Sequence, residues 1–361
     1  MATPENKRIK SEFTAEYKTV RWQSPSNIAL VKYWGKSGDQ IPSSPSISMT
    51  LSRSVSEVGI RYQAEKSREA MQVRFSFEGG KNEKFKLRIL RYLHSLTPML
   101  PFLDQLQMKI ESRNTFPHSA GIASSASGFS ALALCICTME HSFFSTLPDP
   151  YTFFQKASSL ARIGSGSAAR SIYGGYATWG KIQDFEASAD EYASPLEMEI
   201  HPVFRDMYDT ILIVSSREKS ISSSAGHALM VNHPYAEARF RQADENYRAL
   251  IRSLEQGDIE RFTGITEQEA LSLHALMMSS RPGYILLHPH TVLILERVRK
   301  YRDKTGHPVC FTLDAGPNVH LLYPGYYREA ILEFINGELL PLCENGRWID
   351  DRIGEGPVRL E

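Results

Sequence analysis

One stretch constrains the fold of this chain more than any other: residues 121–144 give the strongest helix signal in the sequence. Small residues fill its beginning, and an apolar body with Phe129, Leu132 and Leu134 follows. The first N–H groups of a helix have no intrahelical partner, and small side chains let an anion approach them. The segment 117–128 therefore fits a phosphate-binding loop, and it fits a close helix-packing face equally well.

Composition excludes several classes of partner. Lys and Arg total 41, as do Asp and Glu, so the formal net charge is zero and a general nucleic-acid binder is not expected. No apolar stretch approaches the roughly 18 residues of a membrane span, and the polar N-terminus lacks a signal-peptide core. The four cysteines make no disulfide framework, so we expect buried, reduced thiols in a cytoplasmic protein.

Apolar patterning predicts strands and helices mixed without strict βαβ alternation, which indicates an α+β fold in two lobes. We expect a flexible tail over 1–18, an N-terminal lobe over 19–190 and a C-terminal lobe over 191–361. Strands are predicted at 20–23, 47–51, 58–62, 73–77, 174–179, 210–214 and 310–313. Helices are predicted at 85–96, 121–144, 153–163, 235–254, 259–278, 290–305 and 327–335.

Two turns are also expected in the first half of the chain. The segment Ser24–Asn27 contains proline and asparagine between two apolar runs, which is typical of a turn. The strands at 58–62 and 73–77 are interpreted as part of an antiparallel meander. The pair Gly79 and Gly80 then marks the tip of a hairpin.

Three short segments carry polar groups suited to catalysis. The stretch 164–170 offers the hydroxyls of Ser165 and Ser167 and a guanidinium suited to carboxylate or phosphate, or is a serine-rich turn with a surface arginine. Asp314 ends a predicted buried strand before a glycine turn, where a carboxylate is either a functional acid or a turn cap. Lys32 lies in an apolar context, as an edge residue or as the partner of a distant carboxylate.

Other motifs fail on spacing or context. The run from Gly35 resembles the end of a Walker A loop, but Leu30 stands where that loop needs its first glycine. The stretch 164–169 fits the loosest dinucleotide fingerprint but follows a helix-like segment rather than a strand. His288 and His290 have no third metal ligand nearby in the sequence, so we interpret them as surface histidines at a helix start.

Four segments form a specific set when they are taken together. They are SNIALVKYWGK (26–36), NTFPHSAGIASSASGF (114–129), GSGSAARSIYGGY (164–176) and LDAGPN (313–318). They resemble the motifs of the diphosphomevalonate decarboxylase family, in the GHMP kinase superfamily. The segments occur in the family's order and span most of the chain, whereas no single one of them is specific.

The resemblance implies a reaction, a fold and an assembly. Family members are ATP-dependent carboxy-lyases that convert mevalonate 5-diphosphate into isopentenyl diphosphate, ADP, phosphate and carbon dioxide, in the mevalonate route to isoprenoids. The implied fold is GHMP kinase-like, with a phosphate-binding loop in the N-terminal lobe and a ferredoxin-like C-terminal lobe. The implied partners are the substrate, ATP with Mg²⁺, and a second copy of the chain in a homodimer.

The resemblance also implies roles for single residues. Asp314 would be the catalytic acid or base, Lys32 its cationic neighbour and Arg170 the clamp on the substrate carboxylate. Groups that would hold the substrate's diphosphate and carboxylate are Tyr33, Lys36, Ser165 and Ser167. Groups that would bind ATP are Gly121, Ala123, Ser124, Ser125 and the loop residue Lys219. Ser125 would also reach Mg²⁺ at the ATP phosphates.

Some positions depart from the family's usual pattern, and these concern loop closure and the nucleotide pocket. They are Ser44 and Pro45 in the proline-rich loop, Ser224, His227, Leu286 and Leu287.

Three alternatives share part of this pattern. A decarboxylase of the 5-monophosphate would use the same chemistry, and retention of the diphosphate-binding residues favours the diphosphate. A relative that only phosphorylates the 3-hydroxyl lacks the lysine and aspartate pair, so Lys32 and Asp314 argue against it. A non-catalytic sensor of ATP or isoprenoids would not need Asp314, Lys32 and Arg170 together.

Overall fold

Two long strands organise the N-terminal half of the chain. The computed structural model describes residues 9, 16–38, 40–65, 70–80, 82–116, 124–183, 185, 188–217 and 221–361. Strand β1 (Lys18–Val31) pairs antiparallel with β4 (Ser46–Ala64), and a register shift between Pro25 and Asn27 marks a bulge. The turn expected at this place is wrong because a bulge accommodates a proline inside a continuous strand.

A seven-stranded sheet surrounds these strands within the described residues. Its order is β13-β1-β4-β6-β5, with β7 on β4 and β8 on β7. The remaining bounds are β5 (Gln72–Phe77), β6 (Leu106–Asn114), β7 (Tyr176–Trp179), β8 (Ala193–Pro195) and β13 (Val358–Arg359). Strand β5 runs parallel to β6, so the predicted antiparallel meander is wrong there. Parallel neighbours need a crossover, and helix α1 lies in it. The tight turn predicted at Gly79 and Gly80 is present, because Phe77 and Gly80 form an antiparallel bridge with hydrogen bonds of 3.0 and 2.9 Å before α1 begins.

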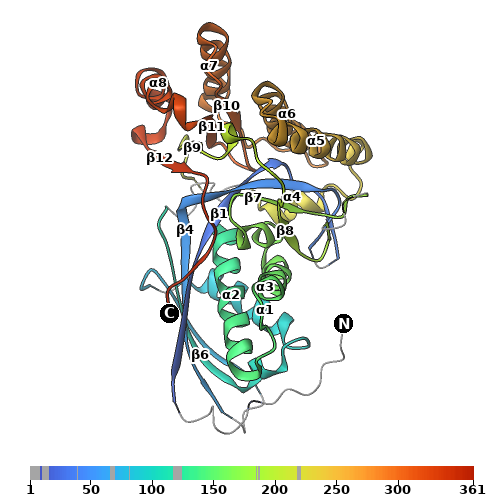
Figure 1. Ribbon diagram of the computed structural model, residues 1–361, viewed down its shortest axis with the longest axis vertical. Coiled ribbons are helices and arrows are strands. Elements are labelled where there is room, and N and C mark those ends of the chain that lie inside the picture. Colours follow the sequence, from blue (N-terminus) through green and yellow to red (C-terminus); the bar gives the residue numbers. More distant parts are fainter. Residues whose placement is uncertain are drawn as a thin grey trace.

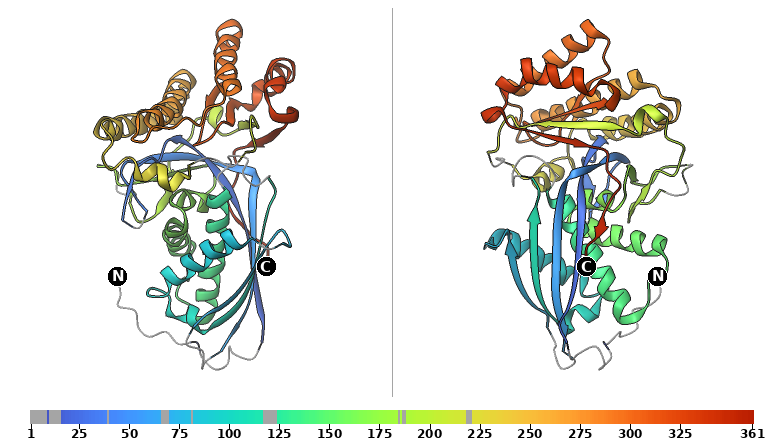
Figure 2. Two further views of the ribbon diagram at one scale, coloured as in Figure 1. Left: turned by 180° about the vertical axis from the view of Figure 1, so that it is seen from behind. Right: turned by 60° about the vertical axis from the view of Figure 1, so that its left-hand side comes forward.

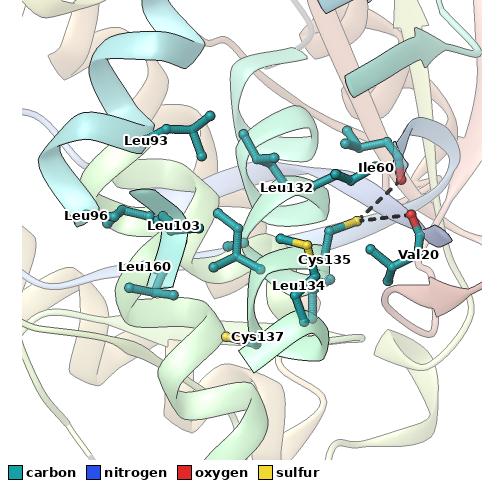
Figure 3. Packing of buried hydrophobic residues seen from close by; sticks show 14 of the residues in the cluster. Val20, Ile60, Leu93, Leu96, Leu103, Leu132, Leu134, Cys135, Cys137 and Leu160 are labelled. Carbon is teal, nitrogen blue, oxygen red and sulfur yellow. Dashed lines mark hydrogen bonds between the residues drawn. The ribbon is translucent and has the colours of Figure 1, made fainter. Parts of the chain in front are cut away.

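Three helices cover one face of this sheet (Figure 1). They are α1 (Glu83–Leu96), α2 (Ser124–Phe144) and α3 (Pro150–Gly164), all of which the apolar periodicity predicts. Helix α2 is buried along most of its length and forms the centre of the N-terminal core. Figure 3 shows Cys135 and Cys137 of α2 among leucines of the neighbouring elements. This packing fixes the direction in which the start of α2 points.

The C-terminal half contains a four-stranded antiparallel sheet with the order β10-β11-β9-β12. Its strands are β9 (Met207–Leu212), β10 (Cys310–Thr312), β11 (Val319–Pro324) and β12 (Trp348–Arg352). Its helices, gathered at one end of the molecule in Figure 1, are α5 (Ala236–Gln256), α6 (Ile259–Ser279), α7 (Pro289–Thr305) and α8 (Arg328–Phe334). With α5–α7 between β9 and β10 and α8 between β11 and β12, this is the ferredoxin-like arrangement.

The two lobes share a hydrophobic core. Side chains of β1 and β4, such as Leu30 and Met49, belong to the same buried cluster as Ile211 of β9 and Leu250 of α5. The C-terminal segment leaves β12 and returns to the first sheet, where β13 pairs with β1 (Figure 2). The lobe junction is therefore packed like a protein interior, and groups that meet there are held firmly.

All four cysteines are free and buried, as predicted. No helix within the described ranges has the length and apolar character needed to cross a bilayer. The ring of His288 accepts the N–H of His290 and so caps the start of α7, which agrees with its interpretation as a histidine at a helix start.

Candidate active site

Lys32 lies where β1 ends and the chain leaves the sheet. Its N–H donates to Glu269 Oε2 at 2.8 Å, and its carbonyl accepts from Arg239 at 3.3 Å, so side chains replace the missing strand partners. Its Nζ donates to the Ala29 carbonyl at 2.6 Å and lies 3.2 Å from Asp314 Oδ1. The residue is 2% exposed. Burial is the main cause that lowers the pKa of Lys32, and the carboxylate of Asp314 opposes it.

Asp314 lies in the loop after β10, in the C-terminal lobe. Its carbonyl accepts the N–H of Gly316 at 2.7 Å and lies 3.1 Å from Nε2 of His274 on α6. A carbonyl oxygen can only accept, so Nε2 of His274 carries the proton in this contact. The carboxylate side chain is 27% exposed, whereas the Lys32 side chain is 2% exposed. A ligand therefore approaches the pair from the side of Asp314.

Arg170 lies in the 3-10 helix Gly166–Ile172 and is 1% exposed. Its Nη1 donates to Ser46 Oγ at 2.6 Å, and its Nη2 lies 3.5 Å from Asn27 Oδ1. The guanidinium carbon is 5.8 Å from the ring centroid of Trp179. Its Nε is buried and has no hydrogen-bond partner among the described residues. A buried donor of this kind is uncommon and suits a ligand with a lone pair.

The charges of Lys32, Arg170 and Asp314 act on one another. Burial lowers the pKa of Arg170 to about 10, while the charges of Asp314 and then Tyr33 raise it. Arg170 in turn is one of the charges that lower the pKa of Lys32. Groups from β1, from the 3-10 helix and from the loop after β10 thus lie within electrostatic reach of each other, with two cations around one carboxylate.

The loop after Lys32 carries two of the predicted substrate-binding residues. The ring of Tyr33 packs against Trp179 at 4.6 Å and against His227 at 4.4 Å between centroids. Lys36 donates from Nζ to Gln40 Oε1 at 2.9 Å, and the Tyr33 hydroxyl lies 3.5 Å from the same oxygen. Gln40 has a positive φ of 63°, a backbone conformation that residues other than glycine rarely adopt. Tyr33 and Lys36 therefore share one polar neighbour.

His227 fastens the short helix α4 (Ser223–Ala228) to this loop. Its ring lies 4.4 Å from Tyr33 and 4.6 Å from Trp34, between centroids, and its Nδ1 accepts the N–H of Gly35 at 3.1 Å. Burial, and secondarily the charge of Lys36, lowers the pKa of His227 to about 3. The ring is consequently neutral near pH 7, with its proton on Nε2.

The serine segments of the two motifs lie close together. Ser125 Oγ of α2 is 3.2 Å from Ser165 Oγ, although they come from different motifs. The carbonyl of Ser167 accepts from Asn27 Nδ2 at 3.1 Å. A Cβ at Gly166 would lie 2.7 Å from the Tyr33 hydroxyl oxygen, so only glycine fits between these serines. The structure thus brings Ser125, Ser165 and Tyr33 to one region.

A cavity of about 310 Å³ opens at the start of α2. It is lined by Phe77, Asn82, Lys84, Phe85, Arg88, Ser112, Asn114, Ser124, Ser125 and Gly128. Three hydroxyls, two amides and two cations among these residues suit a ligand that is polar and anionic in part. Burial, and secondarily the charge of Arg88, lowers the pKa of Lys36. This cavity therefore lies within electrostatic reach of the loop that carries Lys36.

Some predicted residues lie outside the described part of the chain, namely Gly121, Ala123 and Lys219. Among the positions that depart from the family pattern, Ser44 is buried with an Oγ that lacks a partner among the described residues. Contacts to the predicted site come from residues that sequence reasoning missed: Asn27, Gln40, Ser46, Arg239, Glu269 and His274. No local signal marks Glu269, because acids on exposed helix faces have the same spacing in sequence.

Two family models match most of the chain. The model of the diphosphomevalonate decarboxylase-like N-terminal domain matches residues 24–193. The model of the mevalonate 5-diphosphate decarboxylase C-terminal domain matches residues 210–351. Lys32 and Arg170 fall in the first match and Asp314 in the second, so the ion pair joins the two matched regions.

Whole proteins of this family are also similar to the chain. Diphosphomevalonate decarboxylase of Aspergillus fumigatus is 30% identical, with 94% of this chain and 93% of the relative covered. The crystal structure of mevalonate diphosphate decarboxylase from Staphylococcus aureus is 28% identical, with a TM-score of 0.81 over 96% of this chain and 99% of the other. The enzyme from Enterococcus faecalis, described by its mevalonate diphosphate mediated ATP binding mechanism, is 26% identical, with a TM-score of 0.78 over 96% of this chain and 100% of the other. A structure described as MDDEF in complex with MVAPP, AMPPCP and magnesium has the same identity, TM-score and coverage. The chain therefore belongs to the diphosphomevalonate decarboxylase family.

Proposed function

We propose that this chain converts mevalonate 5-diphosphate and ATP into isopentenyl diphosphate, ADP, phosphate and carbon dioxide. The observation that carries the proposal is the ion pair between Lys32 and Asp314, at 3.2 Å, with the buried Arg170 in its field. The family structure that holds MVAPP and the ATP analogue AMPPCP with magnesium supports the choice of substrates.

Asp314 is placed to act on the tertiary hydroxyl of the substrate. That hydroxyl is a poor leaving group, so the γ-phosphoryl group of ATP is transferred to its oxygen first. Asp314 orients the hydroxyl and takes its proton, while the nearby ammonium of Lys32 favours the ionised carboxylate. Transfer of a phosphoryl group depends mainly on alignment and on neutralisation of charge, which fixed cations supply.

Arg170 is placed to hold the carboxylate that leaves as carbon dioxide. Departure of the new phosphate breaks the bond from the tertiary carbon to oxygen and builds positive charge on that carbon. Cleavage of the bond to the carboxylate returns the electron pair, which forms the double bond and releases carbon dioxide. The unpartnered Nε of Arg170 would gain an acceptor from that carboxylate, and Asn27 and Ser46 fix the guanidinium plane.

The remaining predicted contacts divide between the two substrates. The substrate diphosphate would be held by Tyr33, Lys36, Ser165 and Ser167. ATP would be bound by Gly121, Ala123, Ser124, Ser125 and Lys219, of which Ser124 and Ser125 line the cavity at the start of α2. The N–H groups at a helix start favour phosphate, so this cavity suits the nucleotide.

Mg²⁺ fits the same region. Hydroxyl and carboxylate oxygens are the ligand types that this ion prefers, together with phosphate oxygens and water. Ser125 Oγ lies at the cavity and contacts Ser165, so it can face an ion held by ATP phosphates. When bound, the ion would neutralise phosphate charge during transfer.

Assembly, location and lobe boundaries belong to the same proposal. We place the ATP-binding lobe at 19–190 and the second lobe at 191–361. A homodimer in the cytoplasm is the expected assembly, without nucleic-acid or membrane partners. The balanced charge of 41 basic and 41 acidic residues and the free cysteines support that setting.

Turnover tests the proposal directly. The purified protein is incubated with ATP, Mg²⁺ and either mevalonate 5-diphosphate or the 5-monophosphate, and carbon dioxide, phosphate and ADP are measured. Equal release of all three from the diphosphate supports the proposal. Preferred turnover of the monophosphate makes the chain a phosphomevalonate decarboxylase, and ADP release without carbon dioxide makes it a kinase. Binding without any release describes a sensor.

A further inference from the structure

Helix α6 touches the main chain of both members of the central ion pair. It packs against β1, which leads into Lys32, and against β10, which leads into Asp314. We infer that Glu269 and His274 of α6 are positioning residues, which set the separation between the Lys32 amine and the Asp314 carboxylate by holding the backbone of each. This inference rests on the proposed function, because it assigns a role within that reaction.

On the Lys32 side, the buried ion pair of Glu269 and Arg239 binds both the N–H and the carbonyl of Lys32. Glu269 is 0% exposed and Arg239 is 4% exposed, and their side chains form two hydrogen bonds, one of them from Nη1 to Oε1 at 2.7 Å. Glu269 Oε2 accepts the Lys32 N–H at 2.8 Å, and Arg239 donates to the Lys32 carbonyl at 3.3 Å. Asn246 supplies a further hydrogen bond to Glu269 Oε1 at 2.7 Å. Three hydrogen bonds from Arg239 and Asn246 thus fix the carboxylate that accepts the Lys32 N–H.

On the Asp314 side, the ring of His274 performs the same task. His274 is 2% exposed, and its Nε2 donates to the Asp314 carbonyl at 3.1 Å. The same carbonyl accepts the Gly316 N–H, which closes a tight turn directly after the carboxylate. Rotation of the Asp314 backbone would break both contacts, so the direction of the carboxylate depends on α6.

Energetics favour a positioning role over a stabilising one. Removing two charges from water costs several kcal/mol for each ion, and well-packed apolar residues in place of such a pair often leave stability unchanged or improved. Besides their contacts with Gln242 and Asn246, Arg239 and Glu269 each make a hydrogen bond to the backbone of Lys32, whose side chain faces Asp314. Because α5 and α6 belong to the C-terminal lobe, they also tie the residue that directly follows strand β1 to the lobe that carries Asp314.

Glu269 has an electrostatic effect on the same amine. Asp314 and then Glu269 raise the pKa of Lys32 against burial, and Arg170 lowers it. Neutralising Glu269 should therefore let Lys32 lose its proton at a lower pH. A residue that only stabilised the fold would not move the alkaline limb of the pH–rate profile, so this limb separates the two roles.

The first experiment compares two matched glutamates of α6. Glu267 is also buried, at 4% exposure, and pairs with Arg299 and Arg302 away from the site. E269Q and E267Q each neutralise one buried, arginine-paired carboxylate. We expect E269Q alone to lower kcat by about a hundredfold, as misplacement by about 1 Å can do, with its alkaline limb shifted to lower pH and with substrate KM little changed. If E269Q and E267Q both keep the wild-type kcat and the wild-type pH profile, the inference is overturned.

The second experiment addresses His274 with a donor-retaining variant. H274L removes the donor to Asp314, whereas H274Q keeps an N–H group on a side chain of similar reach. We expect H274L to lose at least tenfold in kcat and H274Q to recover part of that loss. T266V is the control for a polar change on the same helix, since Thr266 Oγ1 is buried without a partner among the described residues. Equal kcat in H274L and in T266V contradicts the role of His274.

Crystal structures give a readout that does not depend on turnover. We expect the separation between Lys32 Nζ and Asp314 Oδ1 to grow from 3.2 Å to more than the ~4 Å limit of an ion pair in E269Q and in H274L. A separation that stays at its wild-type value in both variants overturns the inference. Failure of the wild-type protein to release carbon dioxide overturns the proposed function instead.

Discussion

The Lys32 amine lies 3.2 Å from the Asp314 carboxylate, across 282 residues of sequence and between the two lobes. The lysine side chain is 2% exposed and the aspartate side chain is 27% exposed, so the cation forms the closed side of the pair. In the proposed reaction, a substrate hydroxyl would therefore meet the carboxylate oxygen of Asp314 first. This arrangement suits a base, because the buried ammonium of Lys32 favours the ionised form of the Asp314 carboxylate that would accept the proton.

Replacement of Asp314 by Asn removes the proposed base but keeps the shape of the side chain. We expect kcat to fall by at least about a hundredfold, as loss of a general base does. Nucleotide affinity should change little, because the cavity at the start of α2 does not include Asp314. Carbon dioxide release under saturating ATP, together with calorimetric titration of an ATP analogue, measures both quantities. Turnover near the wild-type rate would contradict the role of Asp314.

Replacement of Arg170 by Lys keeps the charge and removes the planar fork. Hydrogen bonds to charged groups contribute about 1.5–3 kcal/mol, so we expect roughly a ten- to hundredfold loss in kcat/KM for the decarboxylation substrate. Affinity for an ATP analogue should stay at its wild-type value. Arg302→Lys is the control, since Arg302 pairs with Glu267 on the far side of α6. Equal kinetics in the two variants would argue against a carboxylate clamp at Arg170.

The regular elements followed from apolar periodicity, because helices such as α5 and α6 bury one side against a sheet over many turns. Apolar periodicity did not predict which strands pair or in which direction. The bulge at Pro25 and the parallel register of β5 on β6 depend on contacts between segments far apart in the chain. The strand β13 is two residues long and exposed, so no local pattern indicates that it returns to β1.

The predicted site residues came from motifs, whereas the residues that support them belong to no motif and could not be predicted. A motif names Lys32 and Asp314, whose roles still await the experiments above, but the groups that hold their backbones are ordinary helix residues in sequence. Glu269 and His274 become noticeable only when burial and partners are known. Burial of a charge has no signature in a single sequence, since charged residues of exposed helix faces have the same spacing.

The buried ring of His227 makes acid stability a test of the contact between α4 and Gly35. Burial lowers its pKa from 6.5 to about 3, so below pH 6.5 the unfolded chain binds a proton that the folded chain does not. Stability is therefore lost as the pH falls from 6.5 toward 3, by up to about 1.4 kcal/mol per pH unit from this residue. His227→Asn keeps an acceptor for the Gly35 N–H without titrating.

Urea unfolding between pH 4 and pH 8 measures this difference. We expect His227→Asn to match the wild-type protein near pH 8 within about 1 kcal/mol, as one retained hydrogen bond implies, and to lose less stability in acid. His227→Leu lacks the acceptor, so it should be less stable than His227→Asn at every pH. Parallel acid profiles for the wild-type protein and His227→Asn would show that another group controls the acid loss.

Asp351 provides a test of how the lobes are joined. Its Oδ1 accepts the N–H groups of Ser52 and Arg53 at 2.9 and 2.8 Å, and its Oδ2 accepts that of Ser54 at 2.7 Å, so one carboxylate of β12 satisfies three donors of β4. Asp351 is 1% exposed. In Asp351→Asn the amide nitrogen must face at least one of these N–H groups. We expect a loss of about 1–3 kcal/mol in the free energy of unfolding, the cost of a buried unsatisfied donor.

The neighbouring Asp350 is the matched control for Asp351→Asn. Its side chain is 18% exposed and binds the guanidinium groups of Arg53 and Arg328, which also contact solvent. Partly exposed pairs of this kind contribute about 0–1 kcal/mol, so Asp350→Asn should destabilise the protein less. Urea midpoints with unchanged slopes measure both effects, since an altered slope would indicate that the lobes unfold separately. If Asp351→Asn is as stable as Asp350→Asn, the backbone contacts of β4 are satisfied by water, and the shared apolar core alone joins the lobes.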